Sequence, residues 1–143
     1  MDERLIYTRA EDGGLSVMIP APGMTKDDVL QHLPADAINP QWVVASALPT
    51  CRTFRDAWAH GGDKVDINID GAKQITHERR RAARATEFAP LDDAIAKQLP
   101  GKSAIELEAD RAAVREKYKL VQEQIEQCES TADLLDVITT EGL

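Results

Sequence analysis

Residues 65–89 read VDINIDGAKQITHERRRAARATEFA, and the hydrophobic period changes inside this stretch. Val65, Ile67 and Ile69 alternate with polar residues, which is the period-2 pattern of a half-buried strand. From Asp70, the expected N-cap, the pattern predicts a helix. The apolar track of this helix comprises Ala72, Ile75, Ala82 and Phe88. The change of period predicts a β-rich region over residues 1–69 and an α-helical region over residues 70–143.

The β-rich region begins with a predicted β-hairpin. The apolar runs Leu5–Tyr7 and Leu15–Ile19 flank Asp12 and Gly13. Glycine accepts the positive φ that a tight primed turn requires, so Asp-Gly between two apolar runs is a strong hairpin signal. The sequence therefore predicts two antiparallel strands joined by a tight turn.

A short helix and a third strand are expected to complete this region. Thr25 is a candidate N-cap, and Asp28 stands three residues later in the capping-box position. The stretch QWVVASAL, residues 41–48, contains enough β-branched and apolar residues to predict a strand. We expect a sheet of two or three antiparallel strands with one helix packed on it.

The α-helical region is expected to form a hairpin or a coiled-coil-like structure. Pro90 should kink the first helix or begin a new one, since proline lacks the backbone donor. Ser103 and Glu106 form a capping box before a second long helix, and residues 130–138 predict a short last one. The second helix carries an apolar seam, interrupted at Arg111, that consists of Leu107, Val114, Tyr118, Val121, Ile125 and Cys128. Its spacing fits both antiparallel pairing with the preceding helix and a self-associating coiled coil. The predicted fold class is α+β.

Composition and charge restrict the function. The formal net charge is −8, which repels phosphate backbones and argues against nucleic acid as a partner. Cys51 and Cys128 lack the spacing of a zinc site or of a disulfide framework, so reduced thiols are expected. The sequence shows no signal-peptide pattern and no apolar run of membrane-spanning length, so synthesis in a cytoplasm is expected and a membrane partner is not.

The sequence predicts no catalytic centre. His32, His60 and His77 stand outside the local signatures of nucleophilic or metal-dependent hydrolysis. We therefore expect a protein that is not an enzyme, with no cofactor and no metal.

The run ERRRAARA, residues 78–85, is the densest positive charge in the chain. Consecutive arginines fan around a helix, so a solvated face is expected there rather than a nucleic-acid site.

The segment CRTFRDAW, residues 51–58, allows two interpretations. Phe54 and Trp58 stand four residues apart and would share one face of a helical turn. Two large rings are worth several kcal/mol of burial, which favours a core anchor. Tryptophan and arginine are also enriched at protein interfaces, so a docking patch that includes Arg52 and Arg55 is the second interpretation.

The order of three segments resembles a family of small tailed-bacteriophage proteins encoded among tail and tail-fibre genes. The segments are residues 6–22, IYTRAEDGGLSVMIPAP; residues 48–58, LPTCRTFRDAW; and residues 65–95, which contain the stretch quoted first. The resemblance covers most of residues 5–95 and includes Leu48, Pro49, Arg52, Phe54, Arg55, Ala57, Trp58, Asp70, Ala72, Lys73, Ile75, Arg80, Arg84, Leu91 and Asp92. The C-terminal third departs from the family pattern. The family has no established chemistry to carry over.

The resemblance implies a non-enzymatic virion protein of a phage tail, made in the host cytoplasm. Its expected partners are tail or tail-fibre proteins, and a homo-oligomer is expected. The predicted partner-binding residues are Arg52, Phe54, Arg55, Trp58, Val114, Tyr118, Val121 and Ile125. A tail-fibre assembly chaperone that is absent from the finished particle is the alternative. A phage nucleic-acid-binding regulator is a third, which depends on the arginine run alone.

Overall fold

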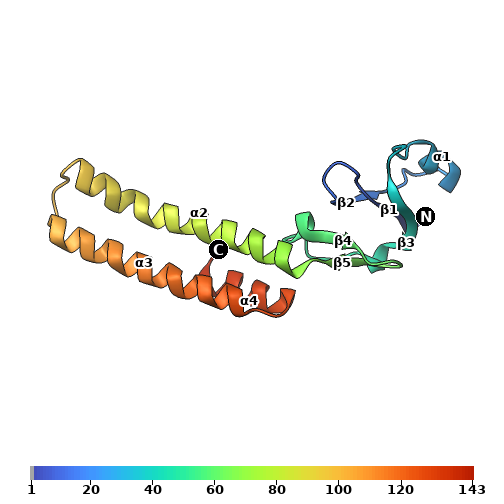
Figure 1. Ribbon diagram of the computed structural model, residues 1–143. Coiled ribbons are helices and arrows are strands. Elements are labelled where there is room, and N and C mark those ends of the chain that lie inside the picture. The colour runs from blue at the N-terminus through green and yellow to red at the C-terminus, as the bar shows by residue number, and fades with distance from the viewer. Residues whose placement is uncertain (1) are drawn as a thin grey trace. The chain divides into compact units, whose positions relative to one another are not determined.

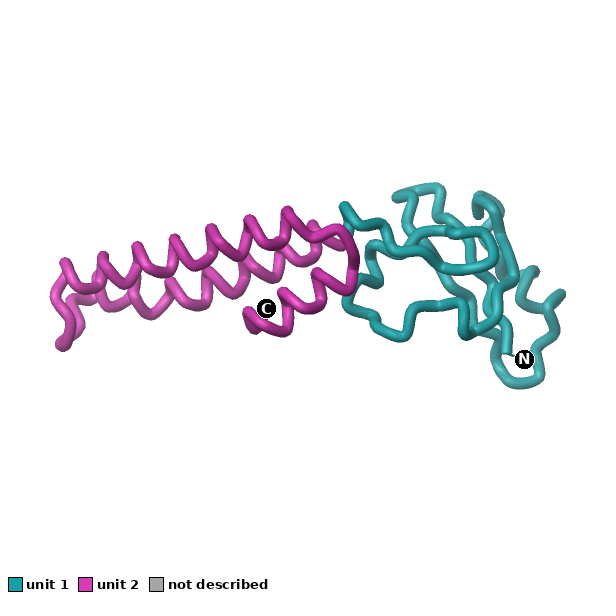
Figure 2. The backbone as a smooth tube through the Cα atoms, turned by 90° about the horizontal axis from the view of Figure 1, so that it is seen from below, with its two compact units in different colours: residues 1–71 teal, residues 72–143 magenta. Residues whose placement is uncertain are grey.

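The fold is mixed α+β, as predicted: antiparallel strands in the first half of the chain precede three helices in the second (Figure 1). The computed structural model describes residues 2–143. The chain divides into two compact units, residues 1–71 and residues 72–143, called unit 1 and unit 2 below (Figure 2). Each unit is described by itself.

Unit 1 contains a three-stranded antiparallel sheet. The strands are β1 (Glu3–Thr8), β2 (Leu15–Met18) and β3 (Ile38–Val44), in the order β2-β1-β3. Ile6 at the centre of β1 pairs with Val17 on one side and Gln41 on the other. Ile6 is fully buried because its side chain belongs to the hydrophobic cluster of this unit. The predicted hairpin and third strand are confirmed.

The turn between β1 and β2 is longer than the predicted two-residue turn. The Arg9 N–H donates to the Gly14 carbonyl at 2.8 Å, and the Gly13 N–H donates to the Arg9 carbonyl at 3.0 Å. Gly13 has φ +70°, as expected, but Asp12 does not adopt the positive φ that a primed turn requires. Instead the Asp12 carboxylate accepts from the Gly14 N–H and from Arg9 Nε, both at 2.9 Å. These side-chain hydrogen bonds stabilise a loop that is longer than a two-residue turn.

The short helix α1 (Lys26–Gln31) confirms the predicted capping box. Thr25 Oγ1 accepts from the Asp28 N–H at 3.2 Å, and the Asp28 carboxylate accepts from the Thr25 N–H at 2.8 Å.

The third strand, β3, begins and ends earlier than predicted. Its end is earlier because residues Ala45–Ala47 form the 3-10 turn η1. Pro40 lies inside β3, where an edge strand tolerates the missing donor.

A second, two-stranded sheet lies beside the first. Its strands are β4 (Trp58–His60) and β5 (Val65–Ile67), which pair antiparallel with Trp58 opposite Ile67. The expected alternation over residues 65–69 therefore forms only a short strand. The buried cluster of unit 1 joins the two sheets and consists of Ile6, Leu15, Val43, Trp58 and Val65.

The first long helix, α2 (Ile69–Ala96), is capped by Asn68 rather than by Asp70. Asn68 Oδ1 accepts from the Gly71 N–H at 2.8 Å, which is the geometry of an N-cap side chain. The helix begins earlier than expected because the Asn68 N–H is held by the Ala57 carbonyl at 2.8 Å. Asp70 lies in the first turn, where its charge favours the helix dipole.

Replacing Asn68 by alanine is expected to lower the free energy of unfolding by about 1 kcal/mol, because the Gly71 N–H loses its acceptor. Asp70→Ala is the matched control and should cost only a few tenths of a kcal/mol through the helix dipole. Urea unfolding followed by circular dichroism measures both values. A larger effect at Asp70 than at Asn68 would contradict the capping assignment.

Two expectations for α2 are corrected. The helix continues through Pro90, so proline does not begin a new helix. The buried stripe of α2 also differs from the expected apolar track, since Ala82 is exposed and Ile75 is half-buried. The buried positions are Ala72, Thr76, Arg80 and Phe88. Their spacing of four and eight residues follows the helical period, but two of the four side chains are polar.

Helices α3 (Ala104–Gln127) and α4 (Thr131–Glu141) complete unit 2. Ser103 and Glu106 form the predicted capping box of α3, and Ser130 caps α4. Side-chain contacts between α2 and α3 run in opposite order along the two helices, so they pack antiparallel, as Figure 2 shows. The contacting pairs are Lys73 with Glu126, Arg80 with Gln122, Glu87 with Tyr118, and Asp92 with Arg111. The predicted helical hairpin is confirmed.

Candidate protein-binding surfaces

Phe54 and Trp58 are core residues of unit 1. Both rings are at most 5% exposed, and Trp58 belongs to the buried cluster that joins the sheets. The two residues do not share a helical face, because the 3-10 turn η2 (Arg55–Ala57) separates Phe54 from Trp58, which begins β4. Of the two interpretations, the core anchor fits these positions, and neither ring offers an accessible surface to a partner.

Arg55 connects the segment of residues 51–58 to the hairpin of β1 and β2. Its guanidinium lies 4.6 Å from the centre of the Trp58 ring, and Nη1 donates to the Leu15 carbonyl at 3.1 Å. Arg9 Nη1 donates to the same carbonyl at 3.0 Å. Burial, followed by the charges of Arg52 and Arg9, lowers the pKa of Arg55. Arg55 therefore has a structural role, whereas Arg52 is exposed.

The predicted seam of α3 is buried inside unit 2. Tyr118, Val121 and Ile125 are at most 2% exposed, and Val114 is half-buried. Antiparallel pairing with α2, with α4 packed on α3, fills the seam within one chain. Tyr118, Val121 and Ile125 therefore have no accessible surface for a partner unless the unit opens, whereas Val114 is partly accessible. Self-association of the chain stays a prediction.

Arg111, which interrupts the seam, bridges the two helices of the hairpin. Its Nε lies 3.0 Å from the Asp92 carboxylate, and its guanidinium lies 5.6 Å from the centre of the Phe88 ring. Tyr118 forms a second bridge, since its hydroxyl donates to Glu87 Oε1 at 2.6 Å, the oxygen that also accepts from Lys117. The hydrogen bonds from Lys117 and Tyr118 lower the pKa of Glu87.

A pocket lined by cations lies between α2 and α3. It has a volume of about 410 Å³ and is called the arginine pocket here. The lining residues are Arg80, Arg81, Arg84, Arg115, Tyr118, Lys119 and Gln122. The expected solvated face is corrected in part, since Arg80 is buried and donates from Nη1 to Gln122 Oε1 at 2.9 Å. The missed signal is the i, i+4 spacing of 80 and 84 on one helix and of 115 and 119 on the other.

Apolar side chains are exposed where α2 and α3 are joined. Ile95 stands in the last turn of α2, Leu99 in the connection and Ile105 in the first turn of α3, with exposed fractions of 36%, 48% and 84%. We call these three residues the apolar loop end. Their exposure contrasts with the filled seam along the rest of the hairpin.

His77 is the histidine whose titration is coupled to the fold of unit 2. Burial, followed by the positive charge of Arg80, lowers its pKa, while Glu126 opposes this effect. The positive charges of Arg81 and Lys73 lower the pKa of His77 further. The folded protein therefore disfavours the protonated form of His77.

Unit 2 is expected to lose stability as the pH falls from about 7.5 to about 5.5, because unfolded chains bind a proton at His77 that the folded unit resists. The stabilisation is complete above the ordinary histidine pKa. His77→Gln should flatten this dependence, whereas His32→Gln, which lies in unit 1, should not. Urea unfolding at the two pH values, followed by ellipticity, measures the difference. An unchanged slope in His77→Gln would refute the coupling.

The remaining reactive side chains have structural partners or lie apart. His32 Nδ1 and His60 Nε2 each lie 2.8 Å from a backbone carbonyl oxygen. Cys51 is exposed and Cys128 is buried, and they belong to different units.

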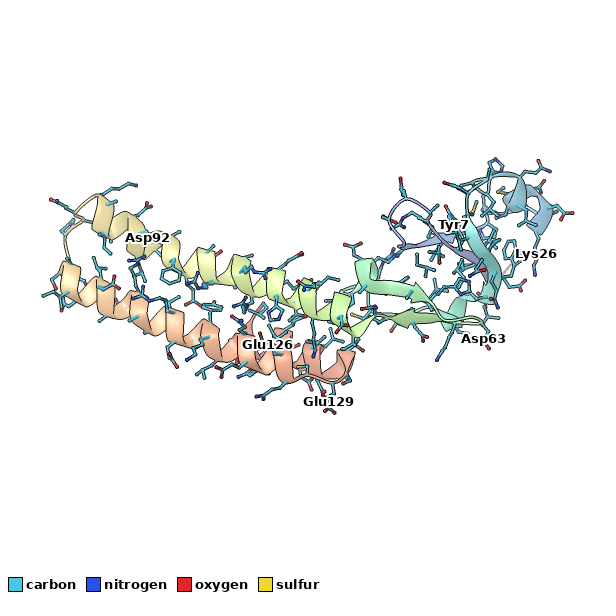
Figure 3. All side chains as sticks on the ribbon, viewed as in Figure 1. Tyr7, Lys26, Asp63, Asp92, Glu126 and Glu129 are labelled. Atoms are coloured by element: carbon cyan, nitrogen blue, oxygen red, sulfur yellow. The ribbon has the colours of Figure 1, made fainter. Side chains whose placement is uncertain are left out.

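Residues 2–143 contain no group of three histidine, cysteine or carboxylate side chains placed to hold a metal ion. No helix in this range has the length and apolar character to cross a membrane. Figure 3 shows the side chains of both units.

No protein-family model, curated protein or solved structure matches this chain. The resemblance to small bacteriophage tail proteins therefore stays a prediction.

Proposed function

We propose that the protein is a non-enzymatic binding component of a bacteriophage tail that attaches to a neighbouring tail or tail-fibre protein. The apolar loop end is the observation that carries the proposal. Its side chains are exposed, although the hairpin fills its own seam. The type of partner comes from the resemblance of residues 5–95 to tail-encoded proteins.

The loop end is suited to binding for energetic reasons. Complete burial of one isoleucine or leucine side chain contributes about 1.5–3 kcal/mol, so three of them can offset part of the cost of association. The capping box at Ser103 and Glu106 holds the first turn of α3, which carries Ile105. A surface that is already ordered loses little conformational entropy on binding.

Ile105→Asp is expected to lower the amount of protein in purified phage particles by about tenfold or more, because a charge enters the apolar contact. The fold should tolerate the change, since an acidic residue in the first turn favours the helix dipole. Leu120→Asp is the matched control, because Leu120 is exposed on α3 outside the loop end. Quantitative mass spectrometry of virions measures incorporation, and equal incorporation of both variants would refute the loop end as the attachment surface.

The same measurement separates a structural component from an assembly chaperone. A structural component should be present in purified virions in a fixed ratio to the other tail proteins. A chaperone should be found with the unassembled fibre in lysates and be missing from the particle. Absence from virions would refute the proposal of a virion protein.

A further inference from the structure

The arginine pocket has an unusual charge balance for this chain. The protein contains 25 acidic and 17 basic residues, yet no carboxylate of the described residues lines this pocket. Four arginines and one lysine line it from two helices. Positive charges gathered at one place repel one another, and an anion among them offsets this repulsion.

Arg80 is the buried cation of the arginine pocket. Its side chain is only 9% exposed, and its buried Nε finds no acceptor within residues 2–143. Burial, followed by the charges of Arg81 and Arg84, lowers the pKa of Arg80, and Glu126 offsets this effect only in part. A buried donor of a charged group without an acceptor is costly, and an anion nearby offsets this cost.

The other cations that line the arginine pocket have hydrogen-bond donors available for a ligand. Arg81 and Lys119 form no ion pair within the described part of the chain. Arg84 lies 4.7 Å from the centre of the Phe88 ring, which leaves the edge of its guanidinium for an acceptor. Arg115 is paired with Glu108. The pocket therefore offers several donors of fixed geometry that can hold carboxylates in a bidentate way.

We propose that the arginine pocket binds a short acidic segment of a partner polypeptide, through several aspartate or glutamate carboxylates. This inference rests on the proposed function and names the chemistry of the partner surface. A single phosphate group would neutralise at most two of the four lining cations that form no ion pair among the described residues, Arg80, Arg81, Arg84 and Lys119. A long nucleic acid would be repelled by the net charge of −8, whereas a short segment meets mainly the local field.

The test titrates a fluorescently labelled hexaglutamate peptide with the full-length protein and follows anisotropy. We expect saturable binding that weakens as sodium chloride rises from about 50 mM to about 200 mM. The double variant Arg81→Gln with Lys119→Gln should weaken binding by about tenfold. The matched control is Arg79→Gln with Lys97→Gln, which removes the same charge outside the pocket and should leave binding within about twofold.

Three results would overturn the proposal. They are no saturable binding of the peptide, equal weakening by the pocket variant and its control, and tighter binding of inorganic phosphate or single-stranded DNA than of the peptide. Failure of the pocket is distinguishable from failure of the proposed function. If the peptide does not bind but Ile105→Asp still lowers incorporation, the pocket proposal is wrong and the tail function stands. If the peptide binds but virions lack the protein, the pocket stands and the virion function is wrong.

Discussion

Trp58→Ala is expected to destabilise unit 1 by about 3–5 kcal/mol, a large part of the stability of a typical domain. Trp58 is 5% exposed in the cluster that joins the two sheets, and its ring also supports Arg55. Removing the ring leaves a cavity that the short strands β4 and β5 cannot close. Chemical unfolding followed by the fluorescence of the remaining tryptophan, Trp42, measures the loss.

Trp42→Ala is the matched control for this prediction. Trp42 is half-buried and lies 5.0 Å from Lys26 Nζ, so its removal should cost clearly less than that of Trp58. Trp58→Phe should keep unit 1 folded, because most of the apolar ring remains and the buried Nε1, which lacks an acceptor among the described residues, is removed. A Trp58→Ala protein as stable as the Trp42→Ala protein would refute the core anchor and favour a docking patch.

Ile125→Ala is expected to destabilise unit 2 by about 2–5 kcal/mol, because the side chain is fully buried between the helices. The loss should be seen in the helical ellipticity during urea unfolding. Leu120→Ala, at a half-exposed position of the same helix, is the control and should change stability by about 0.5 kcal/mol or less.

The same experiment tests whether the seam belongs to one chain. The unfolding midpoint of the wild-type protein should not change with protein concentration, since Tyr118, Val121 and Ile125 are covered within the chain. A midpoint that rises with concentration would show that the seam is shared between chains. In that event the predicted homo-oligomer would form through the seam after all.

Local sequence rules predicted the fold class and the presence of most helices and strands, but not all of their boundaries. The capping boxes at Thr25 and Ser103 depend on residues three positions apart, so short-range pattern reading found both. The hairpin of β1 and β2 was also readable from apolar periods, whereas the period of α3 fitted antiparallel pairing and self-association equally. Local rules of this kind succeed where the two interacting residues lie only a few positions apart in the sequence.

Features that depend on distant residues were missed. Asn68 caps α2 in place of Asp70 because the Ala57 carbonyl, eleven positions earlier, holds the Asn68 N–H. The placement of Trp58 in a second sheet depends on pairing with β5. No periodicity within the segment CRTFRDAW contains that information, since the partners come from other strands.

The sequence by itself determined the apolar face of α3, because the helical period follows from backbone geometry alone. It marked the seam residues Tyr118, Val121 and Ile125 as one apolar stripe. Only the tertiary structure decided what covers that stripe, because antiparallel packing chose α2 of the same chain as its neighbour. For the same reason arginines that fan around one helix meet Arg115 and Lys119 of another, and a pocket forms that neither helix encodes alone.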